Sequence, residues 1–319
     1  MCKFSIIIPC YNSEKNINRL FDMMWTSDYS DYEVIYVDDC SKDNTFEKMQ
    51  GLKEKYPNYT VVRAEKNGGP GLARNLGLEL AKGEYILFCD SGDEFDISYL
   101  ERISTFMNDH DDAQIVVFPH EIVRGNIKTL NDTYSGYGDG DTMPAYDVAR
   151  GCGGPVAKVF KRSIIDENHI QFPDRMTGED KCFLVYYSVH VKKAYKSNMC
   201  FYRYVMSKGS ITHRKNNDIG KPTTFDILQH IYHEHFPEIE IEMFVVNHLL
   251  TRAKTMTDNK CSVKEIREFF EKENQRYSGW IDKVDFKNQS TYRKLIYKAM
   301  YKNKPFLIKF IMYLRRQLY

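Results

Sequence analysis

Short apolar runs alternate with amphipathic segments over the first 125 residues of the chain. The runs have the length of buried strands and are rich in β-branched or aromatic residues; they cover residues 4–8, 33–37, 60–63, 85–89 and 115–118. Apolar residues between the runs recur at helical spacing, for example at Leu72, Leu76 and Leu80. This alternation predicts an α/β fold, with a mainly parallel, Rossmann-like sheet that helices cover on both faces.

The pattern changes after residue 125. Residues 125–150 are polar and rich in glycine, which predicts a long mobile connection. Residues 151–213 regain structure, with a helix predicted from about Glu179 to Ser188, and helical periodicity dominates beyond Lys221. The expected domains are 1–215, with halves at 1–125 and 126–215, and an α-helical C-terminal region at 216–319.

Composition and charge exclude several classes of protein. The 319 residues include 45 Lys plus Arg and 44 Asp plus Glu, so no chain-wide surplus of positive charge suggests a nucleic-acid partner. The 8 cysteines are scattered without a CxxC pair, which favours neither a zinc site nor a disulfide framework. The apolar run at the N-terminus is too short for a signal-peptide core, and no apolar run is long enough to span a membrane. We therefore expect a cytoplasmic protein.

The tail at 291–319 departs from this balance of charge. It has no acidic residue and eight basic ones, interleaved with aliphatic and aromatic residues: Arg293, Lys294, Lys298, Lys302, Lys304, Lys309, Arg315 and Arg316. One interpretation is a pair of amphipathic helices on the anionic inner face of the cell membrane. The other is a helical cap on the protein's own core, with the lysine and arginine stems packed along it. The helical region is also a candidate homodimer interface.

Polar side chains follow three of the predicted strands at the point where each strand ends. The three segments are Pro9-Cys-Tyr-Asn12, Asp38-Asp-Cys-Ser41 and Asp90-Ser-Gly-Asp93. In a doubly wound sheet, ligands bind beyond the carboxyl ends of the strands. Carboxylates without a neighbouring His or Cys suit Mg2+ or Mn2+ better than zinc. The preference of Asp and Asn for turns explains one such segment, but three together favour a site.

Phosphate-binding loops of the common nucleotide-binding kinds are missing from the sequence. Neither GxGxxG after the first strand nor GxxxxGK[ST] occurs, which argues against a dinucleotide dehydrogenase and a P-loop enzyme. The glycine-rich segment is Lys66-Asn-Gly-Gly-Pro-Gly-Leu-Ala-Arg-Asn75, which leads into a helix. Arg74, placed in the first turn of that helix, either binds an anionic group or faces solvent.

Four segments, in order and spacing, resemble the successive motifs of family 2 glycosyltransferases with the GT-A fold. They are Ser5-Ile-Ile-Ile-Pro-Cys-Tyr-Asn12, Val37-Asp-Asp-Cys-Ser-Lys-Asp-Asn-Thr45, Asn67-Gly-Gly-Pro-Gly-Leu-Ala-Arg-Asn75 and Gly83-Glu-Tyr-Ile-Leu-Phe-Cys-Asp-Ser-Gly-Asp93. Three later segments are more loosely similar: 154–162 to the part ahead of the acceptor site, 172–180 to the Glu-Asp motif, and 208–213 to a loop that closes on the donor. Residues past 216 resemble nothing that we recognise.

The resemblance implies a metal-dependent, inverting hexosyl- or N-acetylhexosaminyltransferase. Its donor is expected to be a nucleotide sugar, most often a UDP-sugar, and its acceptor a glycan or lipid-linked hydroxyl in bacterial surface polysaccharide synthesis. The implied donor-binding residues are Pro9, Tyr11, Asn12, Asp39, Asn67, Arg74, Asp90, Ser91 and Lys158. The implied ligands of Mn2+ or Mg2+ are Asp93, Asp90 and His213, although a lone histidine is more often a surface or packing residue. Asp180 is the implied catalytic base, with Glu179 as its alternative.

One residue departs from the family pattern, which more commonly has an acidic residue where this chain has Gly92. Asp93 is therefore the preferred metal ligand, and Asp90 is expected to contact ribose or to position the loop. Two other functions stay open. Gly92 favours a non-catalytic, membrane-docked protein that binds nucleotide sugars. A sugar nucleotidyltransferase would also use paired carboxylates, but it would need a basic glycine-rich loop directly after the first strand.

Overall fold

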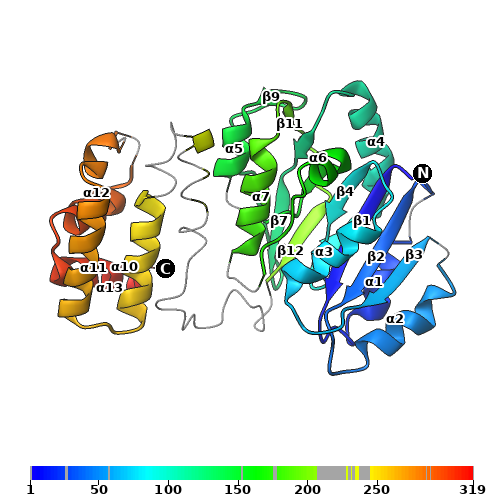
Figure 1. The fold of residues 1–319 in the computed structure, drawn as a ribbon, viewed down its shortest axis with the longest axis horizontal. Coiled ribbons are helices and arrows are strands. Elements are labelled where there is room, and N and C mark those ends of the chain that lie inside the picture. The colour runs from blue at the N-terminus through cyan, green and yellow to red at the C-terminus, as the bar shows by residue number, and fades with distance from the viewer. Residues whose placement is uncertain are drawn as a thin grey trace. The chain divides into compact units, whose positions relative to one another are not determined.

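The computed structural model divides the chain into two compact units, Met1–Arg214 and Lys215–Tyr319 (Figure 1). The structure describes residues 2–25, 28–56, 58–151, 154–174, 178–206, 228, 231, 234–236, 245–284, 286–287 and 289–318. Among these residues, no helix combines the length and the apolar character that crossing a bilayer requires.

An eight-stranded sheet forms the centre of the first unit, in the order β3-β2-β1-β4-β10-β6-β11-β9. Its strands are β1 (Phe4–Cys10), β2 (Tyr32–Asp38), β3 (Tyr59–Arg63), β4 (Tyr85–Phe88), β6 (Ile115–Val117), β9 (Thr142–Met143), β10 (Lys158–Lys161) and β11 (Ala194–Lys196). The first four pair in parallel, as do β6 and β11, whereas β10 runs antiparallel to β4 and β6, and β9 to β11. All five strands predicted from apolar runs are present, in a mainly parallel order.

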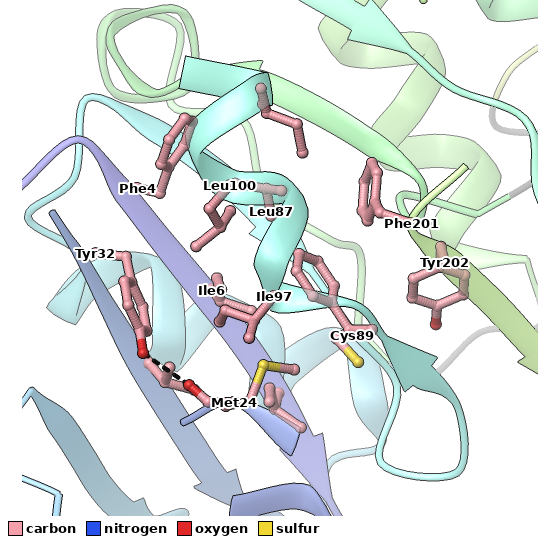
Figure 2. Close-up of a cluster of buried hydrophobic side chains, with 14 of the residues drawn as sticks. Phe4, Ile6, Met24, Tyr32, Leu87, Cys89, Ile97, Leu100, Phe201 and Tyr202 are labelled. Atoms are coloured by element: carbon pink, nitrogen blue, oxygen red, sulfur yellow. Dashed lines mark hydrogen bonds between the residues drawn. The ribbon is translucent and has the colours of Figure 1, made fainter. Parts of the chain in front are cut away.

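Helices cover both faces of this sheet because its strands are apolar on both sides. They are α1 (Ile17–Met23), α2 (Thr45–Lys53), α3 (Pro70–Leu80), α4 (Leu100–Asp109), α5 (Ala145–Arg150), α6 (Arg162–Glu167) and α7 (Glu179–Val189), with a 3-10 turn, η1, at Ile97–Tyr99. Along β1, Ile6 and Ile8 belong to one buried cluster and Ile7 to the other. Figure 2 shows the first cluster, in which the Tyr32 hydroxyl also donates to the Met24 carbonyl at 2.7 Å.

Helix α3 uses its smallest residues to approach the sheet closely. Gly71, Ala73 and Gly77 are buried, whereas Leu80 is exposed. A Cβ at Gly77 would lie 2.4 Å from Cγ2 of Ile7 on β1, so only glycine allows this close approach. The helix exists as predicted from the leucine spacing, and Leu76 is partly buried against the core while Leu80 is exposed.

A second sheet replaces part of the predicted mobile connection. Its order is β5-β12-β7-β8, with strands β5 (Glu94–Phe95), β12 (Tyr202–Val205), β7 (His120–Arg124) and β8 (Ile127–Asn131). The hairpin of β7 and β8 turns at Gly125, where φ is +58°. The expectation of an irregular connection at 125–150 is thus wrong. Strand β8 is an exposed edge strand, and its polar residues give no apolar run by which the sequence would indicate a strand.

The second unit is helical over its described residues, as predicted for the C-terminal region. Its elements are α10 (Asn247–Asp258), α11 (Val263–Arg276), the 3-10 turn η4 (Trp280–Lys283), α12 (Thr291–Tyr301) and α13 (Pro305–Leu318). A capping box starts α11, where Ser262 and Glu265 exchange side-chain and backbone hydrogen bonds. Its core includes the fully buried Trp280, Phe270 and Met300.

Candidate functional site

The carboxyl ends of β1, β2 and β4 are joined to one another by hydrogen bonds. Asp39 N–H, after β2, donates to the Cys10 carbonyl of β1 at 2.8 Å. Asn12 N–H donates to Ser41 Oγ at 2.9 Å. The hydroxyls of Ser13 and Ser91 lie 3.1 Å apart and tie the loop after β1 to the loop after β4. The three polar segments that follow the strands therefore meet at one edge of the sheet, as their positions predict.

The loop after β1 presents one aromatic ring at this edge. Pro9 is buried within β1, whereas the Tyr11 side chain is 41% exposed. Asn12 has φ +48° and its Oδ1 accepts from Lys42 N–H at 2.9 Å, so it shapes the loop. Of these three predicted donor-binding residues, Tyr11 is the one whose ring is placed to stack on a planar group.

Asp39 holds the glycine-rich turn that leads into α3. Its carboxylate accepts from Gly68 N–H at 2.8 Å, from Gly69 N–H at 2.8 Å and from Asn67 Nδ2 at 2.9 Å. Asn67 Nδ2 also donates to the Asp39 carbonyl at 2.8 Å. Gly69 has φ +85°, which favours glycine at this turn. Asp39 and Asn67, predicted to bind the donor, thus lie together and fix the loop above the sheet edge.

Arg74 joins two carboxylates that are far apart in the sequence. Its Nη2 donates to Asp90 Oδ1 at 2.6 Å and its Nη1 to Asp180 Oδ1 at 2.5 Å. The Arg74 side chain is 2% exposed, while those of Asp90 and Asp180 are 40% and 36% exposed. Charge-assisted bonds from one planar guanidinium fix both carboxylates at the solvent boundary.

Aromatic and amide contacts keep Arg74 in place. Its guanidinium lies 5.2 Å from the centre of the Phe172 ring. The neighbouring Asn75 exchanges two hydrogen bonds with the backbone of Phe172, at 2.8 and 2.9 Å. Burial lowers the pKa of Arg74, but Asp180 and Asp90 outweigh it and raise that pKa above its usual range. Arg74 therefore does not face solvent: it is buried, it binds two carboxylates of the protein itself, and it sits in the second turn of α3. Its contact with a bound nucleotide stays a prediction.

The first turn of α7 separates the two candidate bases. Glu179 packs on α3, since a Cβ at Gly71 would lie 3.0 Å from Glu179 Cγ. Asp180 instead faces Arg74 and Gly154, where a Cβ would lie 3.0 Å from Asp180 Oδ2. Burial raises the pKa of Asp180, and Arg74 opposes that rise. Burial, followed by the charge of Asp180, also raises the pKa of Glu179. Of the two candidate bases, Asp180 is thus the one that accepts a hydrogen bond from Arg74.

Lys158 is buried beneath the loop that precedes β10. Its Nζ donates to the carbonyls of Gly154 at 2.9 Å and Val156 at 3.3 Å. Burial, and next the charge of Lys181, lower the pKa of Lys158 to about 8, whereas Asp180 acts in the opposite direction. Lys158 therefore positions the loop beside Asp180, and its predicted contact with the donor stays a prediction.

Asp93 is tied to the second sheet. Its Oδ2 accepts from the Tyr202 hydroxyl at 2.5 Å, and its Oδ1 accepts from Val205 N–H at 2.9 Å. The Tyr202 hydroxyl also accepts from Asp90 N–H at 3.2 Å, so it links the two ends of the 90–93 turn. Asp93 is 3% exposed. The side chain thus anchors the end of β12 to the loop after β4.

The described residues do not fit a divalent cation held by Asp93. Both oxygens of Asp93 already accept hydrogen bonds, Gly92 supplies no ligand, and Asp90 is bound to Arg74. No group of three or more His, Cys, Asp or Glu side chains suited to a metal occurs in the part of the chain that the structure describes. His213, the third predicted ligand, lies outside that part. Mn2+ or Mg2+ therefore stays a prediction.

The buried Asp93 is expected to make stability depend on pH. Burial, and then the charge of Asp90, raise its pKa to about 7. Between an ordinary aspartate pKa of about 4 and this value, the folded state binds more protons than the unfolded state, so stability falls as pH rises. The free energy of unfolding should therefore fall by about 2 kcal/mol less in the Asp93→Asn variant than in the wild type when the pH rises from 5 to 8. Urea denaturation at the two pH values measures this difference. Equal losses would contradict the assignment, and Asp109→Asn, on the exposed end of α4, serves as control.

Sequence reasoning missed three residues of the site. Tyr202 lies in a short strand whose sequence carries no sign of its contact with Asp93, 109 positions away. Phe172 and Asn75 were visible only as neighbours of motif residues, and their pairing joins positions 97 apart. Such contacts depend on the tertiary fold, and no local spacing in the sequence indicates them.

The chain is similar to several known proteins. Residues 5–168 match the family model described as glycosyl transferase family 2. A poly(ribitol-phosphate) beta-glucosyltransferase of Bacillus spizizenii is 34% identical over 221 residues, which make up 65% of this chain and 32% of that protein. The poly(ribitol-phosphate) beta-N-acetylglucosaminyltransferase TarS of Staphylococcus aureus is 31% identical over 189 residues, 57% of this chain and 32% of that protein. The matched regions thus span about a third of the length of these two curated relatives.

A solved structure has the same fold. The crystal structure of S. aureus TarS 1-349 in complex with UDP-GlcNAc gives a TM-score of 0.73 at 22% sequence identity, covering 99% of this chain and 92% of that chain. This likeness confirms the predicted GT-A fold with an α-helical C-terminal region.

Proposed function

Because the chain belongs to glycosyl transferase family 2, we propose that it transfers a sugar from a nucleoside-diphosphate sugar to an acceptor hydroxyl with inversion at the anomeric carbon. The observation that carries the proposal is the Asp90–Arg74–Asp180 bridge at the carboxyl edge of the sheet. It places a solvent-facing carboxylate of the donor loop and one of α7 on the same guanidinium. Donor and acceptor would meet above this bridge.

Asp180 is proposed as the general base. Its carboxylate takes the proton of the acceptor hydroxyl while the acceptor oxygen bonds to the anomeric carbon. The bond from that carbon to the diphosphate oxygen breaks, and its electron pair leaves with the nucleoside diphosphate. A base whose pKa is raised by burial accepts a proton more readily than an exposed aspartate does. Arg74 keeps the same carboxylate ionised and oriented before the reaction.

The donor is proposed to be a UDP-sugar and the acceptor a hydroxyl of an anionic cell-surface polymer. The names of two curated relatives and one solved structure support this. The B. spizizenii and S. aureus proteins are named for transfer of glucose or N-acetylglucosamine to poly(ribitol-phosphate), and TarS was solved with UDP-GlcNAc. On this chain, the exposed ring of Tyr11 is available to stack on the uracil ring of the donor. The turn of Gly68 and Gly69, bound by Asp39, shapes the adjoining loop.

A thermal-shift series with UDP, GDP, CMP and dTDP tests the donor site. A ligand that binds only the folded state stabilises it by about 2.7 kcal/mol at 100 times its dissociation constant. We expect UDP to raise the melting temperature more than the other nucleotides do, and UDP-sugars to raise it further. No shift with any nucleotide would contradict the proposed donor site.

The same series decides the metal question when it is repeated in EDTA and in Mn2+. From the described residues, we expect the UDP shift to persist in EDTA. The Gly92→Asp variant is the matched comparison, because a Cβ at Gly92 meets no atom within 4 Å. It restores a carboxylate at the turn and should gain a Mn2+-dependent increment. A wild-type shift that EDTA abolishes would instead support the predicted Mn2+ or Mg2+ cofactor.

A further inference from the structure

The last helix of the second unit exposes a continuous apolar stripe. Helix α13 packs on α10, α11 and α12 through one side, which includes Ile308, Ile311 and Met312. Its other side carries large apolar residues in solvent: Phe306 (71% exposed), Phe310 (57%), Tyr313 (56%), Leu307 (44%) and Leu314 (43%). Their spacing puts all five on one face of the helix, over a length of about 12 Å. Isolated exposed apolar residues are ordinary, but a contiguous stripe marks an interaction surface.

The surroundings of this stripe are positively charged. Lys302 and Lys304 precede it in the link from α12, Lys309 lies beside it, and Arg315 follows it, stacked on Tyr292 at 5.0 Å from the ring centre. No Asp or Glu occurs between residues 291 and 319. From α11, the carboxylate of Glu265 interacts electrostatically with Lys309. An apolar stripe edged by lysines is complementary to a surface that is apolar inside and anionic outside.

The apolar stripe and the basic residues beside it together indicate which kind of partner this face of α13 binds. A second copy of the same face would bring like charges together, which opposes association. A soluble polyanion would match the lysines and leave the phenylalanines in water. The 14-residue helix is about 21 Å long, shorter than the hydrocarbon core of about 30 Å, so it does not suit a spanning role. The interface of an anionic bilayer matches both the stripe and the charges.

We propose that α13 binds the surface of anionic membranes, with Phe306, Phe310 and Leu314 entering the acyl boundary and the flanking lysines meeting lipid phosphates. The proposal is independent of the transferase activity, because it uses only residues of the second unit. It resolves the two interpretations of the basic tail by assigning both: one side of α13 caps the core and the other binds lipid.

Sedimentation of the full chain with vesicles tests this. Phosphatidylcholine vesicles with and without phosphatidylglycerol are compared, for the wild type and for Phe306→Ser/Phe310→Ser. We expect the wild type to partition onto the anionic vesicles and the variant to lose at least about tenfold in partitioning, since two exposed apolar anchors are removed. The wild type should also release as NaCl rises from about 0.1 to about 0.5 M, because salt screens the lysines.

The matched control is Ile127→Ser/Leu130→Ser, which removes two apolar side chains of similar exposure from β8 in the first unit. It should bind vesicles like the wild type, and both variants should keep the wild-type circular dichroism and melting temperature. Absence of wild-type binding to anionic vesicles, or equal binding by the Phe306→Ser/Phe310→Ser variant, would overturn the proposal. The proposal would also be overturned if the wild type and the β8 control dimerised with rising concentration and the Phe306→Ser/Phe310→Ser variant did not. Binding to inorganic polyphosphate in place of vesicles would overturn it as well.

Discussion

Replacing Asp180 by asparagine is expected to lower kcat for sugar transfer by about 10²- to 10⁴-fold, the usual contribution of a general base. Asparagine has nearly the same shape and still accepts from Arg74 through its carbonyl oxygen, but it does not take a proton. Donor binding should change little, because the melting-temperature shift with UDP does not need the base. The measurement is initial-rate kinetics with a UDP-sugar, together with the UDP shift.

Two variants frame the Asp180→Asn result. Glu179→Gln should cost far less, since Glu179 packs against Gly71, whereas Arg74 donates its hydrogen bonds to Asp90 and Asp180. Asp166→Asn, on the exposed end of α6, should leave the kinetics unchanged. Transfer at the wild-type rate in Asp180→Asn would exclude Asp180 as the base. UDP binding without any turnover in the wild type would favour the non-catalytic interpretation that Gly92 first suggested.

The second large effect is expected for Arg74→Met. Removing one partner of a buried ion pair costs about 3–5 kcal/mol, and here the loss should be nearer the lower value because both carboxylates keep contact with water. The variant should also lose about 10²-fold in kcat, since Asp180 is no longer held in place. Without the guanidinium, the pKa of Asp180 rises, so the acid limb of the pH–rate profile should move to higher pH.

The shift of the acid limb of the pH–rate profile distinguishes an Arg74 that positions Asp180 from an Arg74 that only stabilises the fold. A purely structural Arg74 would change the melting temperature and leave the pH profile of the remaining activity in place. Arg74→Lys keeps the charge but has a single ammonium in place of the fork, so it should recover stability more than kcat. Arg102→Met, an exposed arginine of α4 that stacks on Tyr99, is the control for loss of one positive charge.

Local sequence pattern predicted the elements well where burial is two-sided. The strands of the parallel sheet are apolar throughout, so their runs stand out, and the first turn of α7 follows Gly178 as expected. The pattern did not indicate the close contact of α3 with the sheet, and it missed the exposed strand β8. Helix α3 approaches β1 through glycine and alanine, which carry little hydrophobic signal, and β8 lies at an edge where polar residues are tolerated.

The sequence predicted which residues form the candidate site, but it did not predict which of them contact one another. The motifs brought Asp39, Arg74, Asp90 and Asp180 to notice, but the bond between Arg74 and Asp180 joins residues 106 positions apart. The role of Asp93 also needed the fold, because Tyr202 and Val205 come from another sheet. Spacing alone could not tell a carboxylate that faces a ligand from one that fastens a strand.

The shared guanidinium of Arg74 makes the two halves of the first domain thermodynamically dependent on each other. One positive charge is divided between Asp90 on the loop after β4 and Asp180 on α7. Any ligand that draws Asp90 toward itself leaves more of that charge to Asp180 and moves a like charge away from it, which lowers the pKa of Asp180. By reciprocity, an ionised Asp180 favours the loop position that the ligand selects. Donor occupancy would then set the protonation of the base, so that the base is ionised when a sugar is in place.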